Sequence, residues 1–311
     1  KRLNEKSDLY GFIQMFSHVC LIFIIGYFHF LSIGSLWILL TGLVLGIVIN
    51  FLYAAQHELS HSTVFKTFWI NEFFGRIIGF IMLFPRDYDQ VMHFAHHRWT
   101  QDWEKDGELV REPYTLKSYL LFFLGITYWY NRISGIIRRA RGIIIEPYIR
   151  KMENKKIINE SRAHIFGYLI IFFISIYFET WIALTFWLVP MLITKPFHQL
   201  QNTIEHLGLT HKKEILLNTR STKTNFFLRW LCWQMPYHTA HHTFPSVPFW
   251  KLKELNKKIA SNSGGIYSMG YVEFQIEVIK ALWNKDENQW PMNEVWITSN
   301  RDGSSTRVPM E

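Results

Sequence analysis

The chain has 311 residues, of which 49% are hydrophobic and 17% aromatic, and a formal net charge of +8. That is enough for one large domain or for a membrane-embedded unit, and the thirteen Trp and fourteen Tyr are typical of membrane–water interfaces. The only cysteines, Cys20 and Cys232, are isolated, which excludes zinc-finger and iron–sulfur spacings. No nucleic-acid-binding motif accompanies the basic charge, so we expect no nucleic-acid partner.

Two apolar runs near the start of the chain predict a helical hairpin in the membrane. They cover residues 11–31 and 35–55, and each has about the 20 residues that a helix needs to cross a bilayer. A second hairpin is predicted over residues 163–197, turning near Glu179, with its second arm interrupted by Pro190. The fold class is therefore all-α and integral to a membrane, with four transmembrane helices in two hairpins.

The distribution of charge predicts the orientation of these hairpins. The two tight turns contain no Lys or Arg, whereas residues 57–162 contain many, including Arg138, Arg139 and Arg141. By the positive-inside rule, that segment and both termini lie in the cytoplasm, where they form a helical cap. We expect a multi-pass protein of a bacterial inner membrane, with the endoplasmic reticulum as the alternative.

Three further segments are predicted to be helical. Residues 65–84 and 117–130 are apolar but carry charges, which favours helices lying along the membrane or, alternatively, buried in the cap. Residues 271–283 predict an amphipathic helix with Val272, Ile276 and Ile279 on one face, followed by a polar tail from about residue 285. We therefore predict one membrane-embedded domain over residues 1–260, and a C-terminal helix and tail over 261–311.

Nine of the fourteen histidines fall in four short clusters. The clusters read His57-Glu-Leu-Ser-His61, His93-Phe-Ala-His96-His97, Asn202-Thr-Ile-Glu-His206 and His238-Thr-Ala-His241-His242. Spacings of i, i+3 and i+4 place side chains on one face of a helix, and neutral imidazole is a common metal ligand. This many histidines, with no cysteine among them, indicate more than one metal ion, although imidazole suits Fe, Zn, Cu and Ni alike.

The first cluster, taken alone, has a different meaning. It matches the H-E-x-x-H pattern in which two histidines bind zinc and Glu58 acts as the base of a metalloprotease. That alternative leaves seven clustered histidines unexplained. The two copies of H-x-x-H-H, about 145 residues apart, point instead to a shared metal site.

The boxes, their order and their relation to two apolar hairpins resemble the membrane-bound fatty acid desaturase and hydroxylase superfamily. The resemblance covers residues 11–255 and implies two iron ions in a cytoplasmic cap, with dioxygen as co-substrate. It implies a catalytic site made of the metal ligands alone: His57, His61, His93, His96, His97, His206, His238, His241 and His242. Asn202 would contact a metal through water or lie just outside the ligands.

The resemblance has two branches. The boxes beginning at His57 and Asn202 also resemble those of integral-membrane alkane hydroxylases, whereas the box at His238, with the Phe-Pro that follows it, is more similar to desaturases. We therefore expect insertion of a double bond into a lipid acyl chain, with hydroxylation of an alkane, fatty acyl or other lipid chain as the alternative. Since the sequence shows no heme or iron–sulfur segment, electrons would come from a separate ferredoxin, rubredoxin or cytochrome b5 type carrier.

Several polar residues near the boxes are candidates for orienting the ligands. Glu58, Asp106 and Glu205 are carboxylates that could hold ligand imidazoles in place. His198 shares a helical face with Asn202 and His206, at i, i+4 and i+8. We expect His198 to act as a supporting residue rather than as a tenth ligand.

Overall fold

The computed structural model describes residues 2–102, 104–109 and 114–284. The protein is mostly helical, as predicted, with two short strands among the described residues. The chain divides into two compact units. We call residues 7–90 and 122–198 the apolar unit, and residues 1–6, 91–121 and 199–311 the histidine unit. The predicted boundary at residue 260 stays a prediction, and the tail from residue 285 lies outside the described residues.

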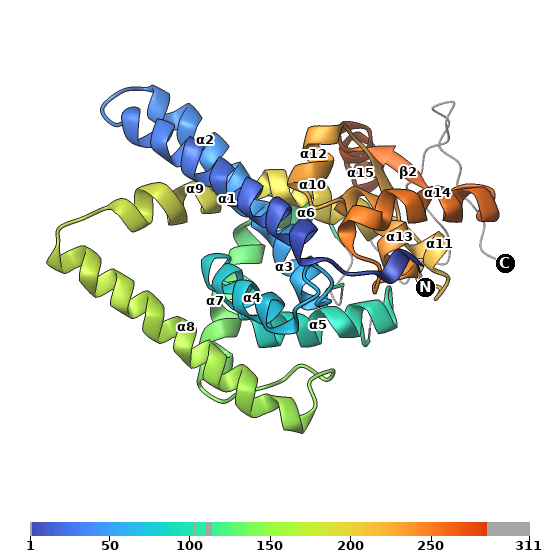
Figure 1. The fold of residues 1–311 in the computed structure, drawn as a ribbon, viewed down its shortest axis with the longest axis horizontal. Helices are drawn as coiled ribbons and strands as arrows, with labels where there is room; N and C mark the ends of the chain where they lie inside the picture. The colour runs from blue at the N-terminus through green and yellow to red at the C-terminus, as the bar shows by residue number, and fades with distance from the viewer. Residues whose placement is uncertain (1, 103, 110–113, 285–311) are drawn as a thin grey trace. The chain divides into compact units, whose positions relative to one another are not determined.

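The helices that lie entirely within the apolar unit range from 5 to 27 residues (Figure 1). They are α1 (Asp8–Leu31), α2 (Trp37–Asn50), α3 (Leu52–Ser60), α4 (Phe68–Ile81), α7 (Ile126–Ala140), α8 (Lys151–Tyr177), the π-helix η2 (Leu184–Leu188) and α9 (Val189–Ile193). Two helices, α5 (Arg86–Trp99) and α10 (Lys195–His206), begin in this unit and end in the histidine unit. Each of these two carries a histidine box in its second half.

Among the described residues, three stretches are long and apolar enough to cross a membrane: Asp8–Leu31, Trp37–Ser60 and Lys151–Tyr177. They correspond to the first three predicted spans. The helix pair α4 and α5, bent by 100° at the break, is a fourth candidate. The predicted fourth arm is not one long helix. It consists of the π-helix η2 followed by the short helix α9, which ends at Ile193.

Close packing joins α2 to α9 within the apolar unit. A Cβ at Gly46 would lie 2.1 Å from the carbonyl oxygen of Pro190, so only glycine permits this approach. Asn50 is fully buried beside it, and its Nδ2 donates to the Met191 carbonyl at 2.7 Å and to Thr194 Oγ1 at 2.8 Å. The side-chain amide of Asn50 therefore provides a hydrogen-bond donor to the backbone of α9 in a place that water does not reach.

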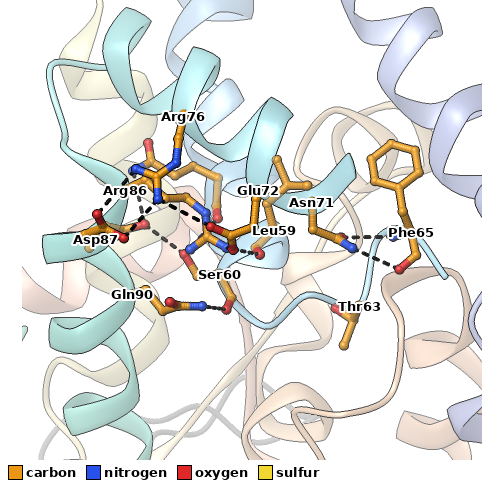
Figure 2. Close-up of polar contacts among 12 residues, drawn as sticks. Leu59, Ser60, Thr63, Phe65, Asn71, Glu72, Arg76, Arg86, Asp87 and Gln90 are labelled. Atoms are coloured by element: carbon orange, nitrogen blue, oxygen red, sulfur yellow. Dashed lines mark hydrogen bonds and ion pairs between the residues drawn. The ribbon is translucent and has the colours of Figure 1, made fainter. Parts of the chain in front are cut away.

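A network of ion pairs fixes the sharp bend between α4 and α5 (Figure 2). Arg86, fully buried at the start of α5, donates through Nη2 to the Leu59 carbonyl at 3.0 Å and to Glu72 at 2.6 Å. Arg76 on α4 pairs with Asp87 on α5 at 3.2 Å and with Glu160 on α8 at 2.8 Å. The predicted helix over residues 65–84 is thus present as α4, but its end is tied to α5 and α8.

The predicted helix over residues 117–130 is broken in two. One part is α6 (Leu116–Phe123), and the second is α7. Gly125 lies between them with φ of 84°, a conformation that favours glycine, and a Cβ there would lie 2.8 Å from the Cβ of Lys195. The apolar pattern continues across this turn, which is why periodicity alone did not reveal the break.

The histidine unit consists of short elements. They are η1 (Arg2–Asn4), α11 (Ile215–Asn218), β1 (Ser221–Lys223), α12 (Phe226–Leu231), η3 (Met235–Tyr237), α13 (His238–Thr243), η4 (Phe249–Lys251), α14 (Leu252–Ser263), β2 (Ser268–Gly270) and α15 (Tyr271–Asn284). The strands β1 and β2 pair in parallel, with Ser221 opposite Ser268. The helix α15 confirms the predicted helix over 271–283, but it buries Phe274 and Val278 and leaves the predicted stripe at Val272 and Ile276 exposed.

Candidate metal centre

Seven of the nine predicted ligands lie in the histidine unit. His93, His96 and His97 follow one another along α5, His206 ends α10, and α13 carries His238, His241 and His242. On α5 and α13 the i, i+3 and i+4 spacing turns three rings toward one side of each helix. Within this unit the structure arranges the seven rings as two adjoining groups.

The first group, which we call the four-histidine cluster, contains His96, His206, His238 and His242. One ring nitrogen of each lies within 4.8 Å of the others, and all four side chains are buried. The Nε2 atoms of His96 and His206 are 3.2 Å apart, and those of His238 and His206 are 2.7 Å apart. Four imidazoles from three helices thus direct nitrogen atoms at one point.

The outer nitrogen of each ring in the cluster faces an oxygen. His96 Nδ1 lies 3.0 Å from both oxygens of Asp106, and His206 Nδ1 lies 3.0 Å from the Asn218 carbonyl. His238 Nδ1 is 3.3 Å from Glu205, and His242 Nδ1 is 3.4 Å from Thr100 Oγ1. An outer partner fixes both the tautomer and the orientation of a ligand imidazole. Asp106 and Glu205, two of the predicted supporting carboxylates, therefore lie beside the outer nitrogens of His96 and His238.

Asp106 also organises the loop that follows α5. Its carboxylate accepts hydrogen bonds from the backbone N–H groups of Gln101 at 2.9 Å, Glu108 at 2.8 Å and Leu109 at 3.1 Å. Burial acts to raise the pKa of this carboxyl, but the His96 ring and the backbone donors together hold the pKa below its ordinary value. The ionised Asp106 carboxylate thus fixes the orientation of the His96 ring through its Nδ1 atom.

The chemistry of the cluster fits a metal ion. Burial lowers the pKa of His206 to about 3 and that of His242 well below its ordinary value, so both rings are neutral near pH 7. Among the described residues, the buried Nε2 of His242 has no hydrogen-bond partner. Neutral imidazole nitrogens that converge on one point, as those of His206 and His242 do, are what a divalent cation requires. Burial disfavours the charged form of His96, but the Asp106 and Glu108 carboxylates raise its pKa to about 9, so a bound cation would replace the proton on its Nε2. The cluster is therefore able to hold a metal ion.

The second group in the histidine unit contains His93, His97 and His241, again with ring nitrogens within 4.8 Å of one another. His97 Nε2 lies 3.0 Å from His93 Nε2 and 3.1 Å from His241 Nε2. His93 Nδ1 meets Glu108 at 2.7 Å. The rings of His97 and His242 stack with centroids 4.2 Å apart, so this group adjoins the four-histidine cluster.

The remaining two predicted ligands, His57 and His61, belong to the apolar unit. They lie on α3 and just after it, with ring centroids 5.4 Å apart. Glu58 between them is fully buried, and its Oε2 accepts a hydrogen bond from Thr63 Oγ1 at 3.4 Å. Glu58 lies 3.6 Å from His57 Nδ1, so it is a neighbour of this ligand candidate too.

The other predicted residues of α10 differ from one another. His198, in the apolar unit, is buried with its Nδ1 2.6 Å from Lys195 Nζ and its ring edge-on to Tyr53, centroids 4.3 Å apart. Asn202 is half-buried in the histidine unit, one turn before His206. These contacts make His198 part of a polar packing arrangement within the apolar unit.

Sequence reasoning missed four residues around the cluster. Thr100 lies three residues and Glu108 eleven residues after the end of the His93 box, so their proximity was a usable signal. Asn218 acts through its backbone carbonyl, and side-chain type says nothing about that. Arg220 is fully buried, and its Nη1 donates to the carbonyls of Ile204 at 2.6 Å and Leu207 at 3.1 Å, which fixes the end of α10 beside His206.

A helical chain with apolar candidate spans and a polyhistidine metal site has the features of a membrane oxidoreductase. A fatty acid desaturase family model matches residues 34–274, and the chain belongs to this family. It is 20% identical to an sn-1 oleoyl-lipid 12-desaturase of Picosynechococcus, over 83% of this chain and 79% of that protein. It is 25% identical to a sphingolipid delta(4)-desaturase of Drosophila melanogaster, over 72% and 66%.

The chain is also similar to a hydroxylating enzyme. It is 24% identical to an alkane 1-monooxygenase of Acinetobacter baylyi, over 73% of this chain and 54% of that protein, so it spans about half of that relative's length. Family membership makes the chain an oxidoreductase. It gives no support to the zinc protease alternative based on His57, Glu58 and His61.

Proposed function

We propose that the protein is a membrane-bound di-iron enzyme that uses dioxygen to introduce a double bond into a lipid acyl chain. The observation that carries the proposal is the convergence of four buried imidazoles, each with its outer nitrogen facing an oxygen. In this proposal the four-histidine cluster holds one iron. His93, His97 and His241 hold the second, and the first box supplies His57 and His61 to complete that ligand set.

Bound iron supplies the oxidising power for removing hydrogen from unactivated C–H bonds, which no side chain can do. The balance is two C–H hydrogens, one dioxygen, two electrons and two protons giving one C=C bond and two waters. The two electrons come from a separate one-electron carrier. A ferredoxin, a rubredoxin and a cytochrome b5 are the candidates for this role.

The protein's own residues hold the rings and their protons. Asp106 accepts a hydrogen bond from Nδ1–H of His96, and the Asn218 carbonyl accepts one from Nδ1–H of His206. In each ring this leaves Nε2 to direct its lone pair toward the metal. Glu205 lies 3.3 Å from His238 Nδ1, without a hydrogen bond to it, and Gln201 donates to Glu205 at 2.7 Å. In the second group, Glu108 stands behind His93. The proposed role of Asn202 is a water-mediated contact beside the metals.

The proposed membrane arrangement follows from the apolar candidate spans and the Lys and Arg distribution. The histidine boxes face the cytoplasm of a bacterial inner membrane, with the endoplasmic reticulum as the alternative, and the substrate enters from the bilayer. The large exposed apolar side chains on α1 and α8 suit contact with lipid, such as Phe23, Phe173 and Tyr177. Such a site would reach an acyl chain without extracting the lipid into water.

Hydroxylation is the second candidate, because the chain is similar to an alkane 1-monooxygenase and because its first box carries Glu58. Both reactions begin with removal of one hydrogen. They differ in whether a second hydrogen leaves or one oxygen atom is retained. Both consume the same two electrons and two protons, so the ligand set serves either outcome.

One experiment tests the proposal and separates the two outcomes. The protein is expressed in a host that lacks the activity, its iron content is measured, and total lipids are analysed by mass spectrometry. We expect about two irons per chain and a lipid that is lighter by two hydrogens, formed only with dioxygen. A product heavier by one oxygen establishes hydroxylation. One zinc per chain, with activity that survives without dioxygen, would refute both.

A further inference from the structure

A cleft of about 1300 Å³ opens on the histidine unit. The wall on one side comes from α11 and β1, and the other side is formed by α14 and the segment that leads into β2. Residues on its lining include Lys213, Leu217, Lys223, Thr243, Ala260 and Tyr267. None of these residues belongs to the proposed ligand set.

Two short bonded routes connect residues of the cleft lining to the four-histidine cluster. Thr243 lines the cleft and directly follows His242 in α13. Leu217 lines it and directly precedes Asn218, whose carbonyl lies 3.0 Å from His206 Nδ1. The route from Thr243 to His242 is one peptide unit. The route from Leu217 to His206 is one peptide unit and one hydrogen bond. Short bonded routes of this kind are suited to electron tunnelling.

The rim of the cleft is basic. Lys213 and Lys223 line it and are exposed, and they outnumber the single lining carboxylate, Glu214. The adjoining helix α14 adds the exposed Lys253 and Lys257, while its exposed Glu254 is paired with Lys258 at 3.0 Å. A cluster of cations at the mouth of a cleft raises the local concentration of an anionic partner and increases its association rate.

The arginine-rich segment of the apolar unit is less suited to such docking. Arg138 and Arg139 both pair with Glu146, at 2.6 and 3.0 Å. Arg139 is buried, and its guanidinium lies 3.5 Å from the centre of the Tyr88 ring. These arginines therefore hold the segment after α7 in place, and the cleft of the histidine unit is the better docking surface.

We propose that this cleft docks an acidic one-electron carrier protein, which reduces the metal site through the Thr243 and Leu217 walls. The inference rests on the proposed function, because that reaction consumes two electrons for each dioxygen. Each docking event transfers one electron from a reduced iron–sulfur or heme carrier. Two such events, with two protons from water, supply one turnover, and the carrier leaves oxidised.

The test is a charge-reversal variant, Lys213→Glu with Lys223→Glu, in the full-length protein. The probes are three soluble carriers with acidic surfaces: a plant-type [2Fe–2S] ferredoxin, a rubredoxin and a cytochrome b5 domain. With the carrier that supports turnover, we expect the variant to raise the KM for the carrier about tenfold and to lose the salt dependence of kcat/KM. Iron content should stay unchanged.

A matched control carries the same change of charge elsewhere. Lys155 and Lys156 are exposed on α8 in the apolar unit, so Lys155→Glu with Lys156→Glu alters the net charge equally. We expect the carrier KM of this control to stay within about twofold of the unmodified protein, since neither lysine lines the cleft. An equal rise in both variants would overturn the docking proposal.

A second variant tests the cleft without changing charge. Ala260→Trp fills the lining of the cleft from α14 and should also raise the carrier KM. Both cleft variants are then reduced anaerobically with dithionite and given one pulse of dioxygen. Product formed in this single turnover should equal that of the unmodified protein, because no carrier is needed.

The outcomes separate this inference from the proposed function. If carrier KM is unchanged in both cleft variants, the docking site is wrong while the enzyme assignment stands. The same holds if none of the three carriers supports turnover but dithionite does. If the variants raise the KM for the lipid alone, the cleft binds a lipid headgroup instead. If the unmodified protein forms no product even after dithionite, the proposed function itself fails.

Discussion

Buried histidines occur in both units, yet their surroundings differ. In the apolar unit, His29 uses both ring nitrogens, Nδ1 toward Thr41 Oγ1 at 2.9 Å and Nε2 toward the Thr185 carbonyl at 3.1 Å. In the histidine unit, His206 has only Nδ1 on an oxygen, and its Nε2 faces the nitrogens of His96 and His238. Both side chains are almost fully buried, at 3% and 4% exposure. Burial therefore does not distinguish a candidate ligand such as His206 from a packed histidine such as His29, whereas the partner of the second nitrogen does.

The largest effect is expected at the centre of the four-histidine cluster. The substitution His206→Ala removes the ring that lies between His96 and His238, so we expect iron to be lost and product to be undetectable. Iron per chain and lipid mass spectrometry measure this. The control His211→Ala changes a histidine outside both histidine groups and should retain iron and activity. Full iron and full activity in His206→Ala would show that the contrast between His206 and His29 does not identify a metal ligand.

A smaller effect is expected behind the ligands. The substitution Asp106→Asn keeps the size of the side chain but replaces an ionised acceptor that faces His96 and three backbone N–H groups. Loss of such an outer partner typically weakens metal affinity by about 10- to 100-fold. Competition with a chelator of known affinity measures the change. Unaltered affinity would mean that the orientation of His96 does not depend on this carboxylate.

Glu205→Gln should have a smaller effect than Asp106→Asn. Glu205 lies 3.3 Å from His238 Nδ1 without a hydrogen bond to it, and glutamine retains an oxygen that can accept from Gln201 in the same position. We expect iron affinity to fall by about threefold, within the range expected for one weakened hydrogen bond. The same chelator titration gives the ratio of the two variants. A loss larger than that of Asp106→Asn would reverse the assigned importance of the two carboxylates.

The smallest effect on iron is expected in the apolar unit. His29→Leu removes two hydrogen bonds between α1 and its neighbours and leaves the Thr185 carbonyl without this partner. An unsatisfied buried acceptor costs about 1–3 kcal/mol of stability, so thermal unfolding in detergent should begin at a lower temperature. Iron per folded chain should not change. Iron loss without a change in unfolding temperature would place His29 with the ligands.

Much of this arrangement could be predicted from the sequence because its signals are local. The H-x-x-H-H spacing fixes which faces of α5 and α13 carry rings, and the apolar runs fix α1 and α2. Asp106 and Glu205 could be proposed because they lie near the boxes in the chain. Whether His57 and His61 join the other seven remains a prediction, as does the one-domain boundary at residue 260.

Other features had no local signal. The bend between α4 and α5 depends on Arg86 reaching the Leu59 carbonyl and Glu72, contacts that span 27 and 14 residues. The break at Gly125 lies inside an apolar pattern that continues on both sides. The role of Asn218 belongs to a backbone carbonyl, which every residue type carries. Such features arise from tertiary contacts, and a single sequence does not encode them as a pattern.

The hydrogen bonds that converge on Asp106 have a consequence for the order of assembly. The loop is tied to this carboxylate through Gln101, Glu108 and Leu109, so protein contacts restrain the loop around His96. These contacts reduce the conformational entropy that the loop can lose when an ion binds, in contrast to small domains that fold only around their metal. Where several divalent ions compete, restrained ligands favour selection by geometry and by supply over selection by the general affinity order of the metals.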